Sequence, residues 1–213
     1  MGGTAVPGGP ARPGRKRSET SRQAILAAAL ELTAEVGYAG LTVDGIAARA
    51  GTGKQTIYRW WPSKDDVLLE ALAGQADLHV PIPDNGSYAA DLRAFLTASF
   101  DLGRRQQVAD ILRALMARAQ IEEAFGRRFR SEFVQRRRDA LAVILDRAAA
   151  RGELPPHLPR GTITDIVFGV IWYRLLATGQ PLDGRLAGEL VTALATPQRG
   201  PARPGAPMSG KQA

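Results

Sequence analysis

Side chains that form hydrogen bonds crowd a short stretch between a pair of glycines and Pro62. They are Lys54, Gln55, Thr56, Tyr58, Arg59 and Trp60. Arginine and lysine suit guanine edges and phosphates, glutamine suits adenine, and the methyl group of threonine can touch a thymine methyl. Tyrosine and tryptophan can contact the sugar-phosphate backbone. A folded core would not contain so many donors, so we expect this stretch to face a polar partner.

The elements that must position this stretch begin with an amphipathic first helix. Its apolar stripe has the spacing of one helix face and consists of Ile25, Ala29, Leu32 and Val36. Thr20 and Gln23 can form a capping box at the start of this helix, and Gly37 supplies a stop at its end. We expect the next two helices to pack on this first one.

A second, short helix is expected over residues 43–50. Thr42 has the side chain of an N-cap, and Ile46 and Ala47 (followed by Ala50) would face inward. Gly51 ends the helix, because glycine adopts the left-handed backbone that a tight turn needs. The pattern predicts a turn that leads directly into the polar stretch.

A third helix is expected over residues 54–61, with Ile57 and Trp61 facing the core. Two short helices joined by a tight turn on a longer helix form a helix-turn-helix, whose second helix lies in a DNA major groove about 12 Å wide. Ser63 caps a fourth helix, and Lys64 with the amino end of that helix offers a phosphate clamp. The side chains expected to contact DNA are Thr42, Val43, Lys54, Gln55, Thr56, Tyr58, Arg59, Trp60 and Lys64.

Residues 18–72 resemble the DNA-binding domain of the tetracycline-repressor (TetR) family. The matching residues are Leu41-Thr42-Val43-Asp44, Ile46-Ala47, Ala50-Gly51, Lys54, Thr56-Ile57-Tyr58-Arg59, Trp61 and Pro62-Ser63-Lys64. The aromatic-Pro-Ser-Lys joint at 61–64 distinguishes the family from other helix-turn-helix proteins. Gly53, Gln55 and Trp60 depart from the residues common in the family, and Gln55 and Trp60 leave the operator sequence open.

The rest of the chain has helical periodicity after a break at residues 79–86. Helices are expected at about 87–104, 106–119, 121–151, 161–178 and 183–195. The fold class is therefore all-α, with about nine helices. The expected organisation is a disordered tail at 1–14, a helix-turn-helix DNA-binding domain at 15–79, a helical ligand-binding and dimerisation domain at 86–196 and a second disordered tail at 197–213.

The second domain resembles the variable ligand-binding part of the same family, down to the sequence YRLLATGQPLD at its end. This implies a pocket for a small, largely apolar effector. Candidate walls are Phe95, Leu96, Phe100, Leu112, Leu115, Met116, Phe129, Phe133, Trp172 and Tyr173. Arg113, Arg118 or Arg174 could pair with an acidic ligand if they point inward. The arginine clusters at 127–130 and 136–138 are interpreted instead as solvated polar faces.

Residues 161–178 are apolar over much of the helix circumference, which is more than one contact face requires. Residues 183–195 carry a comparable apolar stripe made of Leu186, Leu190, Val191 and Leu194. In the TetR family the corresponding eighth and ninth helices form a four-helix dimer interface, so the resemblance implies a homodimer. A dimer would place two recognition helices about 34 Å apart and require a roughly palindromic operator.

The sequence offers no group for catalysis or for a bound cofactor. There is no cysteine, and His79 and His157 are the only histidines and share no metal-ligand spacing. No histidine-based triad or phosphate-binding glycine loop is present. We therefore expect neither an enzyme nor a metalloprotein.

The formal net charge of +7 favours a polyanionic partner such as nucleic acid. The run Arg15-Lys16-Arg17 is either a solvated tail or an arm that reaches phosphate or a minor groove. No apolar run follows it, and no segment has the roughly 18 apolar residues of a membrane span. We expect a cytoplasmic protein without a membrane partner.

Together these patterns predict a ligand-responsive DNA-binding transcriptional regulator, namely a repressor that a small molecule releases from a palindromic operator. Two alternatives stay open: a transcriptional activator, or an architectural DNA-binding protein that ignores ligands. An all-α enzyme with an incidental helix-turn-helix would need an acid, base or metal cluster in the second domain, and the sequence shows none.

Overall fold

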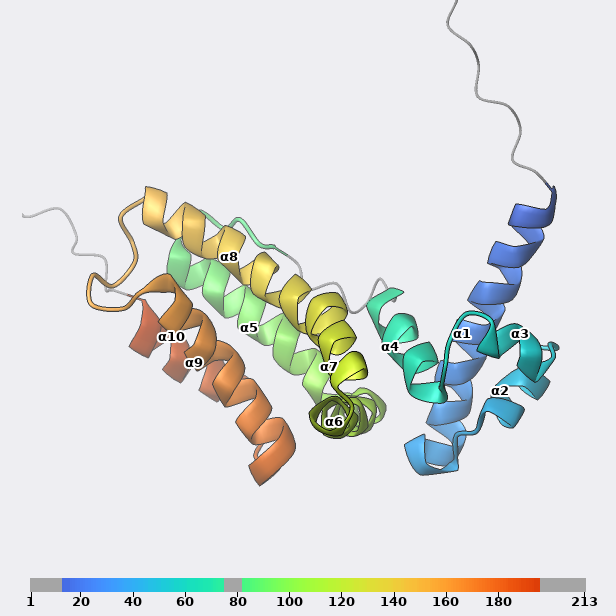
Figure 1. The fold of residues 1–213 in the computed structure, drawn as a ribbon. Coiled ribbons are helices and arrows are strands. Elements are labelled where there is room, and N and C mark those ends of the chain that lie inside the picture. Colours follow the sequence, from blue (N-terminus) through green and yellow to red (C-terminus); the bar gives the residue numbers. More distant parts are fainter. Residues whose placement is uncertain (1–12, 75–81, 196–213) are drawn as a thin grey trace, which may run out of the picture.

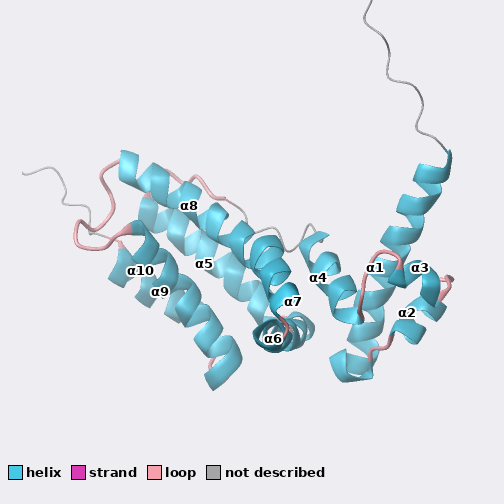
Figure 2. Ribbon diagram, in the orientation of Figure 1, coloured by secondary structure: helices cyan, strands magenta, loops and turns pink. Residues whose placement is uncertain are grey.

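The computed structural model describes residues 13–74 and 82–195. Within these ranges the secondary structure consists of α-helices and two short π-helical segments, with no strand (Figure 2). The prediction of an all-α fold is confirmed. Residues 1–12, 75–81 and 196–213 lie outside the described residues, and with them His79 and nearly all of the two expected tails.

Four helices form the amino-terminal end of the molecule. They are α1 (Pro13–Gly40), α2 (Val43–Arg49), α3 (Lys54–Tyr58) and α4 (Lys64–Gly74). Helices α2 and α3 lie against α1 at one end of the molecule, and α4 lies on the side of α1 that faces the other helices (Figure 1).

The second part of the chain packs beside α4. It contains α5 (Tyr88–Arg104), α6 (Gln106–Ile121), α7 (Glu123–Phe129), the π-helical segment η2 (Arg130–Val134), α8 (Gln135–Ala150), α9 (Arg160–Trp172), the π-helical segment η3 (Tyr173–Thr178) and α10 (Gly184–Leu194). Helices α5, α8, α9 and α10 gather at the far end, and α6 and α7 lie between them and α4 (Figure 1). Segments α7, η2 and α8 follow one another without a break and correspond to the single helix expected at 121–151.

The buried apolar side chains form two clusters, and the first of them crosses the expected domain boundary. It joins side chains of α1–α4, such as Ile25 and Leu69, to side chains of α6 and α7, such as Leu115 and Phe129. The second cluster is built from α5, α8, α9 and α10. The helix-turn-helix part is therefore packed directly on the second part rather than tethered to it by the linker alone.

The caps predicted for the short helices are present. The Thr42 hydroxyl accepts a hydrogen bond from the Gly45 amide at 3.0 Å, which starts α2. At the start of α4 the Asp66 amide donates to the Ser63 hydroxyl at 3.3 Å, and that hydroxyl donates to the Asp66 carboxylate at 2.6 Å. These contacts satisfy backbone donors that a helix terminus otherwise leaves without a partner.

The start of the first helix was predicted wrongly. Helix α1 begins at Pro13, a residue type that suits a first helical turn, so Pro13 and Gly14 belong to the helix and not to a tail. Thr20 lies inside the helix and cannot be its N-cap. The Gln23 side chain instead donates to Glu19 one turn earlier, at 3.1 Å.

The end of the first helix matches the prediction in one respect and differs in another. The helical backbone breaks at Gly37, whose φ of 71° is open to glycine, before a last turn ends at Gly40. Val36 is 48% exposed, however, and does not continue the apolar stripe. The buried face passes through Thr33 instead, whose hydroxyl bonds to the Ala29 carbonyl at 2.6 Å.

The contact between α6 and α7 depends on a glycine. A Cβ atom at Gly126 would lie 2.5 Å from the Ala119 carbonyl oxygen, which belongs to the backbone and cannot turn aside. We expect Gly126→Ala to force the two helices apart and to lower the free energy of unfolding by about 1–3 kcal/mol.

Chemical denaturation followed by circular dichroism measures this effect. Gly161→Ala is the matched control, because a Cβ there meets open space and should leave stability unchanged or raise it by about 0.5–1 kcal/mol. An unchanged unfolding midpoint for Gly126→Ala would show that the two helices do not need this close approach.

Candidate nucleic-acid interface

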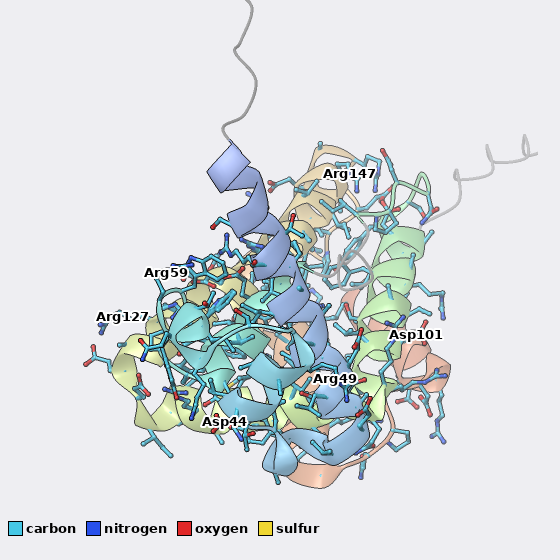
Figure 3. All side chains as sticks on the ribbon, turned by 90° about the vertical axis from the view of Figure 1, so that its right-hand side faces the viewer. Asp44, Arg49, Arg59, Asp101, Arg127 and Arg147 are labelled. Atoms are coloured by element: carbon cyan, nitrogen blue, oxygen red, sulfur yellow. The ribbon has the colours of Figure 1, made fainter. Side chains whose placement is uncertain are left out.

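Helix α3 presents the predicted polar face to the outside. Ile57 and Trp61 are fully buried and anchor the helix to the core. Lys54, Gln55, Tyr58 and Arg59 are exposed on the opposite side, and Thr56 and Trp60 are partly exposed. Figure 3 looks onto this end of the molecule, where Arg59 and Asp44 lie at the outer surface.

The turn before α3 brings the two short helices to the required angle. Gly51 has a φ of 63°, a backbone region that favours glycine, and the Thr52 amide donates to the Ala47 carbonyl at 2.9 Å. Gly53 is the N-cap of α3 and makes no side-chain capping bond. The turn therefore has the form that the sequence predicted.

The charged side chains on the outer face of α3 make only weak interactions with the rest of the subunit, as far as the described residues show. The Lys54 ammonium lies 2.6 Å from the Asp44 carboxylate, and this hydrogen bond raises the pKa of Lys54. The Arg59 guanidinium lies over the Trp60 ring at 5.1 Å from its centre. Both lysine and aspartate are largely exposed, and such surface pairs contribute little, so a phosphate can replace the carboxylate.

Lys64 is placed differently from the phosphate clamp that the sequence predicted. Its ammonium donates to the carbonyl oxygens of Tyr38 at 3.1 Å and Leu41 at 2.9 Å and lies 4.4 Å from the centre of the Tyr38 ring. Lys64, the first residue of α4, therefore holds the start of that helix against the end of α1. A DNA phosphate could use only the third N–H of this ammonium.

A group of arginine–carboxylate contacts joins α6 and α7 to the start of α4. Arg118 of α6 bonds to the Asp65 carboxylate and donates to the Ser63 hydroxyl at 2.6 Å. Arg128 of α7 donates to the Asp66 carboxylate at 2.5 Å. We call these five residues, Ser63, Asp65, Asp66, Arg118 and Arg128, the inter-domain clamp.

Further contacts tie the clamp to the rest of the helix-turn-helix. The Tyr38 hydroxyl donates to Asp65 at 2.8 Å, and burial together with this bond raises the pKa of Tyr38 to about 12, so the phenol keeps its proton at neutral pH. The Trp61 indole donates to Glu70 at 2.9 Å, and Glu70 also accepts from Arg22 at 2.8 Å. Helix α3 is thus connected to the clamp through the segment that follows it.

The clamp was not predicted from the sequence. Arg128 was expected to belong to a solvated cluster, and Arg118 to be a possible partner for a ligand. Acidic residues in a first helical turn are common, because they favour the helix dipole, so Asp65 and Asp66 carried no distinctive signal. Their burial beside arginines that are distant in the sequence appears only in the folded chain.

The predicted pocket walls do not form one site. Phe95, Leu96 and Phe100 are buried in the second cluster, whereas Leu112, Leu115, Met116, Phe129 and Phe133 belong to the first or pack against it. Trp172 is partly buried and touches both clusters. Tyr173 is 63% exposed, so its prediction as a pocket wall is wrong; its side chain points to the outside of η3.

One small cavity of about 30 Å³ lies between these clusters. Three of the predicted walls, Leu112, Phe133 and Trp172, line it, together with Ser99 and Arg137, which the sequence analysis did not select. Arg113 instead donates to Asp110 and to the Leu175 carbonyl, and Arg174 donates to the Pro181 carbonyl. Neither of these arginines lines the cavity.

The apolar stripe of α10 is covered within its own subunit. Leu186, Leu190, Val191 and Leu194 are all buried within the subunit, where α10 packs against α5. An amphipathic stripe does not reveal which neighbour covers it, and the dimer interface through the eighth and ninth helices stays a prediction. In α9 and η3, by contrast, Tyr173 and Leu176 are exposed apolar side chains.

Two kinds of feature were sought among residues 13–74 and 82–195, a metal site and a membrane-spanning helix. No group of histidine, cysteine, aspartate and glutamate side chains there could hold a metal ion. No helix there has the length and apolar character needed to cross a membrane.

A helix-turn-helix with an outward polar second helix, packed on a second helical part, defines the class of helix-turn-helix transcriptional regulators. Residues 25–71 match the family described as "Bacterial regulatory proteins, tetR family", and residues 82–194 match "Tetracyclin repressor-like, C-terminal domain". This chain belongs to the TetR family of bacterial DNA-binding transcriptional regulators.

Individual relatives agree with this assignment. The chain is 34% identical over 180 residues to the HTH-type transcriptional regulator YdeS of Bacillus subtilis, which covers 84% of this chain and 89% of that protein. It is 31% identical over 183 residues to the DNA-binding transcriptional repressor TetR of Mycobacteroides abscessus, covering 82% and 92%. The solved TetR-family regulator SCO0332 superposes with a TM-score of 0.70 at 31% identity, over 81% of this chain and 94% of the other.

The exposed Tyr58 and the internally bonded Lys64 should respond differently to substitution. Tyr58→Ala should weaken binding to promoter DNA about three- to tenfold without changing stability, because the side chain contacts nothing essential in the subunit. Lys64→Ala should lower the free energy of unfolding by about 1–2 kcal/mol, since it removes hydrogen bonds to two carbonyls.

Fluorescence anisotropy with labelled promoter DNA, at one fixed salt concentration, measures binding, and thermal melts measure stability. Tyr58→Phe keeps the ring and separates the contribution of the hydroxyl. Unchanged DNA affinity for Tyr58→Ala would show that DNA does not contact this face of α3.

Proposed function

We propose that the protein is a homodimeric repressor that binds a roughly palindromic operator and leaves it when a small, largely apolar molecule binds the second part of each subunit. The observation that carries this proposal is the inter-domain clamp, which bonds α4 of the helix-turn-helix to α6 and α7. A repressor of this kind acts on the bacterial chromosome, so we place it in the cytoplasm.

The operator contact rests on the outward face of α3. Its lysine, glutamine, threonine and arginine suit base edges in a major groove, whereas Tyr58 and Trp60 suit the backbone. We expect Thr42 and Val43, at the start of α2, to contact the DNA backbone next to this groove. In a helix-turn-helix the recognition helix reads the base sequence, and the elements around it position the protein on the DNA backbone.

The homodimer rests on the exposed apolar face of α9 and η3. Ile166, Val170 and Tyr173 recur at the spacing of one helix face, and Leu176 follows them. Ile166 and Val170 are only partly covered by their own subunit, and Tyr173 and Leu176 are exposed. Two copies of this face packed together, with the polar outer side of α10 at the rim, would bury these side chains.

The release mechanism rests on α6, which extends from the cavity to the clamp. Leu112 lines the cavity and Arg118, further along the same helix, bonds to Asp65. A ligand that enlarges the cavity would shift α6 and carry α4 and α3 with it. The ligand shifts the equilibrium only by its differential affinity for the DNA-bound and released states.

The direct test of this function is footprinting on the promoter region that flanks the protein's own gene. We expect protection of two half-sites about one helical turn, or about 34 Å, apart. A screen of small molecules against the footprinted complex should then find compounds that release it. Selection from random DNA without any enriched sequence would instead favour the architectural alternative, and transcription that increases on binding would favour an activator.

The clamp gives a second test, in which effector response separates from DNA binding. Arg118→Lys keeps the positive charge but cannot bond Ser63, Asp65 and Glu122 together, as the guanidinium does. We expect the variant to fold and bind operator, and to need about tenfold more of the releasing compound, because coupling between the sites is reduced.

Arg127→Lys is the matched control, because Arg127 is exposed and pairs with Glu123 on its own helix. Anisotropy titrations of each operator complex with the compound give the comparison. If Arg118→Lys releases operator at the wild-type concentration, the signal does not pass through the clamp.

A further inference from the structure

Arg59, at the end of α3, is held by an aromatic ring rather than by a carboxylate. Its guanidinium lies over the Trp60 ring, 5.1 Å from the ring centre. Within residues 13–74 and 82–195 it forms no ion pair with an acidic side chain. Lys54, at the start of the same helix, differs, because its ammonium lies 2.6 Å from the Asp44 carboxylate. The two cations of α3 are therefore held in different ways.

This difference decides which hydrogen-bond donors are free for DNA. A guanidinium has five N–H donors in a planar fork, and an aromatic ring can hold it without using those donors. A carboxylate beside an ammonium instead accepts one of its donors, and a DNA acceptor must replace that bond. Arg59 is thus the cation of α3 whose donors need not leave a partner on the protein before they bind DNA.

The ring under Arg59 is fixed to the folded subunit. Trp60 is partly buried and packs against the first apolar cluster. Its ring meets the buried Trp61 ring nearly at a right angle, with 5.4 Å between the ring centres. The Trp61 indole in turn donates to Glu70 at 2.9 Å. Arg59 therefore rests on a side chain that the core holds in place, and ordering it on DNA costs less conformational entropy than ordering a free arginine.

The place of Arg59 on α3 limits what it can contact. Arg59 follows Gln55 by four residues, both are exposed, and the Arg59 amide donates to the Gln55 carbonyl at 3.2 Å. Residues at this spacing lie about 5–6 Å apart on one side of a helix. Because the first residues of a recognition helix contact base edges, Arg59 would lie one turn further along the groove, near another base pair or the adjacent backbone.

We propose that Trp60 is a positioning residue for operator binding, whose ring directs the Arg59 guanidinium toward a pair of acceptors on the DNA. These acceptors are guanine O6 and N7 or two phosphate oxygens, since an arginine fork binds either pair in the same bidentate way. Trp60 acts through Arg59 and not through a backbone contact of its own, which its residue type would allow. The inference deepens the operator contact of the proposed function and rests on it.

A double-mutant cycle on operator binding tests the coupling of the two residues. Trp60→Leu keeps apolar bulk and removes the ring, and Arg59→Ala removes the guanidinium. Fluorescence anisotropy of the full chain is measured at one salt concentration with an operator selected from random DNA. We expect Trp60→Leu to weaken binding about three- to tenfold in the wild type, but less than about 1.5-fold when Arg59 is already alanine. Equal losses in the two backgrounds would overturn the proposal, because Trp60 would then act on the DNA itself or through the fold.

Lys54→Ala gives the matched control, because Lys54 pairs with Asp44 and not with Trp60. Trp60→Leu should cost the same factor in this background as in the wild type, and a loss that disappears here too would contradict a specific link to Arg59. Trp60→Phe, which keeps a ring, should lose at most about twofold. Thermal melts report folding, and if Trp60→Leu does not fold, the cycle with Trp60→Phe decides, since its loss should vanish in the Arg59→Ala background.

A second selection from random DNA with Arg59→Ala distinguishes the two kinds of acceptor. Loss of a guanine preference at one position of each half-site assigns the base edge. Unchanged preferences, with weaker binding and a salt dependence reduced by about one charge per subunit, assign a phosphate. Unchanged affinity of Arg59→Ala would overturn the proposal.

The same measurements separate this inference from the proposed function. A wild-type protein that selects an operator but shows no coupling between Trp60 and Arg59 contradicts the positioning role alone. If no sequence is enriched, the repressor function fails, and the cycle on non-specific DNA still decides whether Trp60 directs Arg59 to a phosphate.

Discussion

The pairing of two buried carboxylates with arginines from another part of the chain determines how this molecule is assembled. Asp65 and Asp66 lie in the first turn of α4 and are 6% and 3% exposed. A buried carboxylate is costly unless a cation and hydrogen bonds compensate it, and Arg118 and Arg128 provide that compensation from α6 and α7. Helix α4 is therefore held against these two helices as well as against α1, and its position in turn places α3.

This constraint explains why the two halves share a core. The apolar side chains of α1 and α4 belong to the same buried cluster as those of α6 and α7. The two parts therefore cannot move past each other without disturbing this cluster. Interiors packed in this way transmit small displacements, because they resist continuous deformation. The cavity lies at one part of α6 and the clamp at another, which gives a physical connection between the proposed effector site and the recognition helix.

Local signals in the sequence predicted the parts of the structure that depend on neighbouring residues. The caps at Thr42 and Ser63, the turn at Gly51 and the outward face of α3 follow from spacing and backbone preference, and the structure has them. Contacts between distant segments left no comparable signal. The internal bonds of Lys64, the bonds of Arg118 and Arg128 to buried carboxylates and the exposure of Tyr173 depend on which helices meet. Periodicity shows only that a face is apolar, not what covers it.

We expect the helix-turn-helix and the helices α6 and α7 to form one cooperative unit. Native-state hydrogen exchange of the whole chain in increasing denaturant tests this most directly, because it reports the free energy at which each helix opens. In one cooperative unit, the core amides of α1 and α4 exchange with the same opening free energy and denaturant dependence as those of α6. Opening of α1–α4 at a clearly lower free energy, while α6 and α7 stay protected, would contradict it.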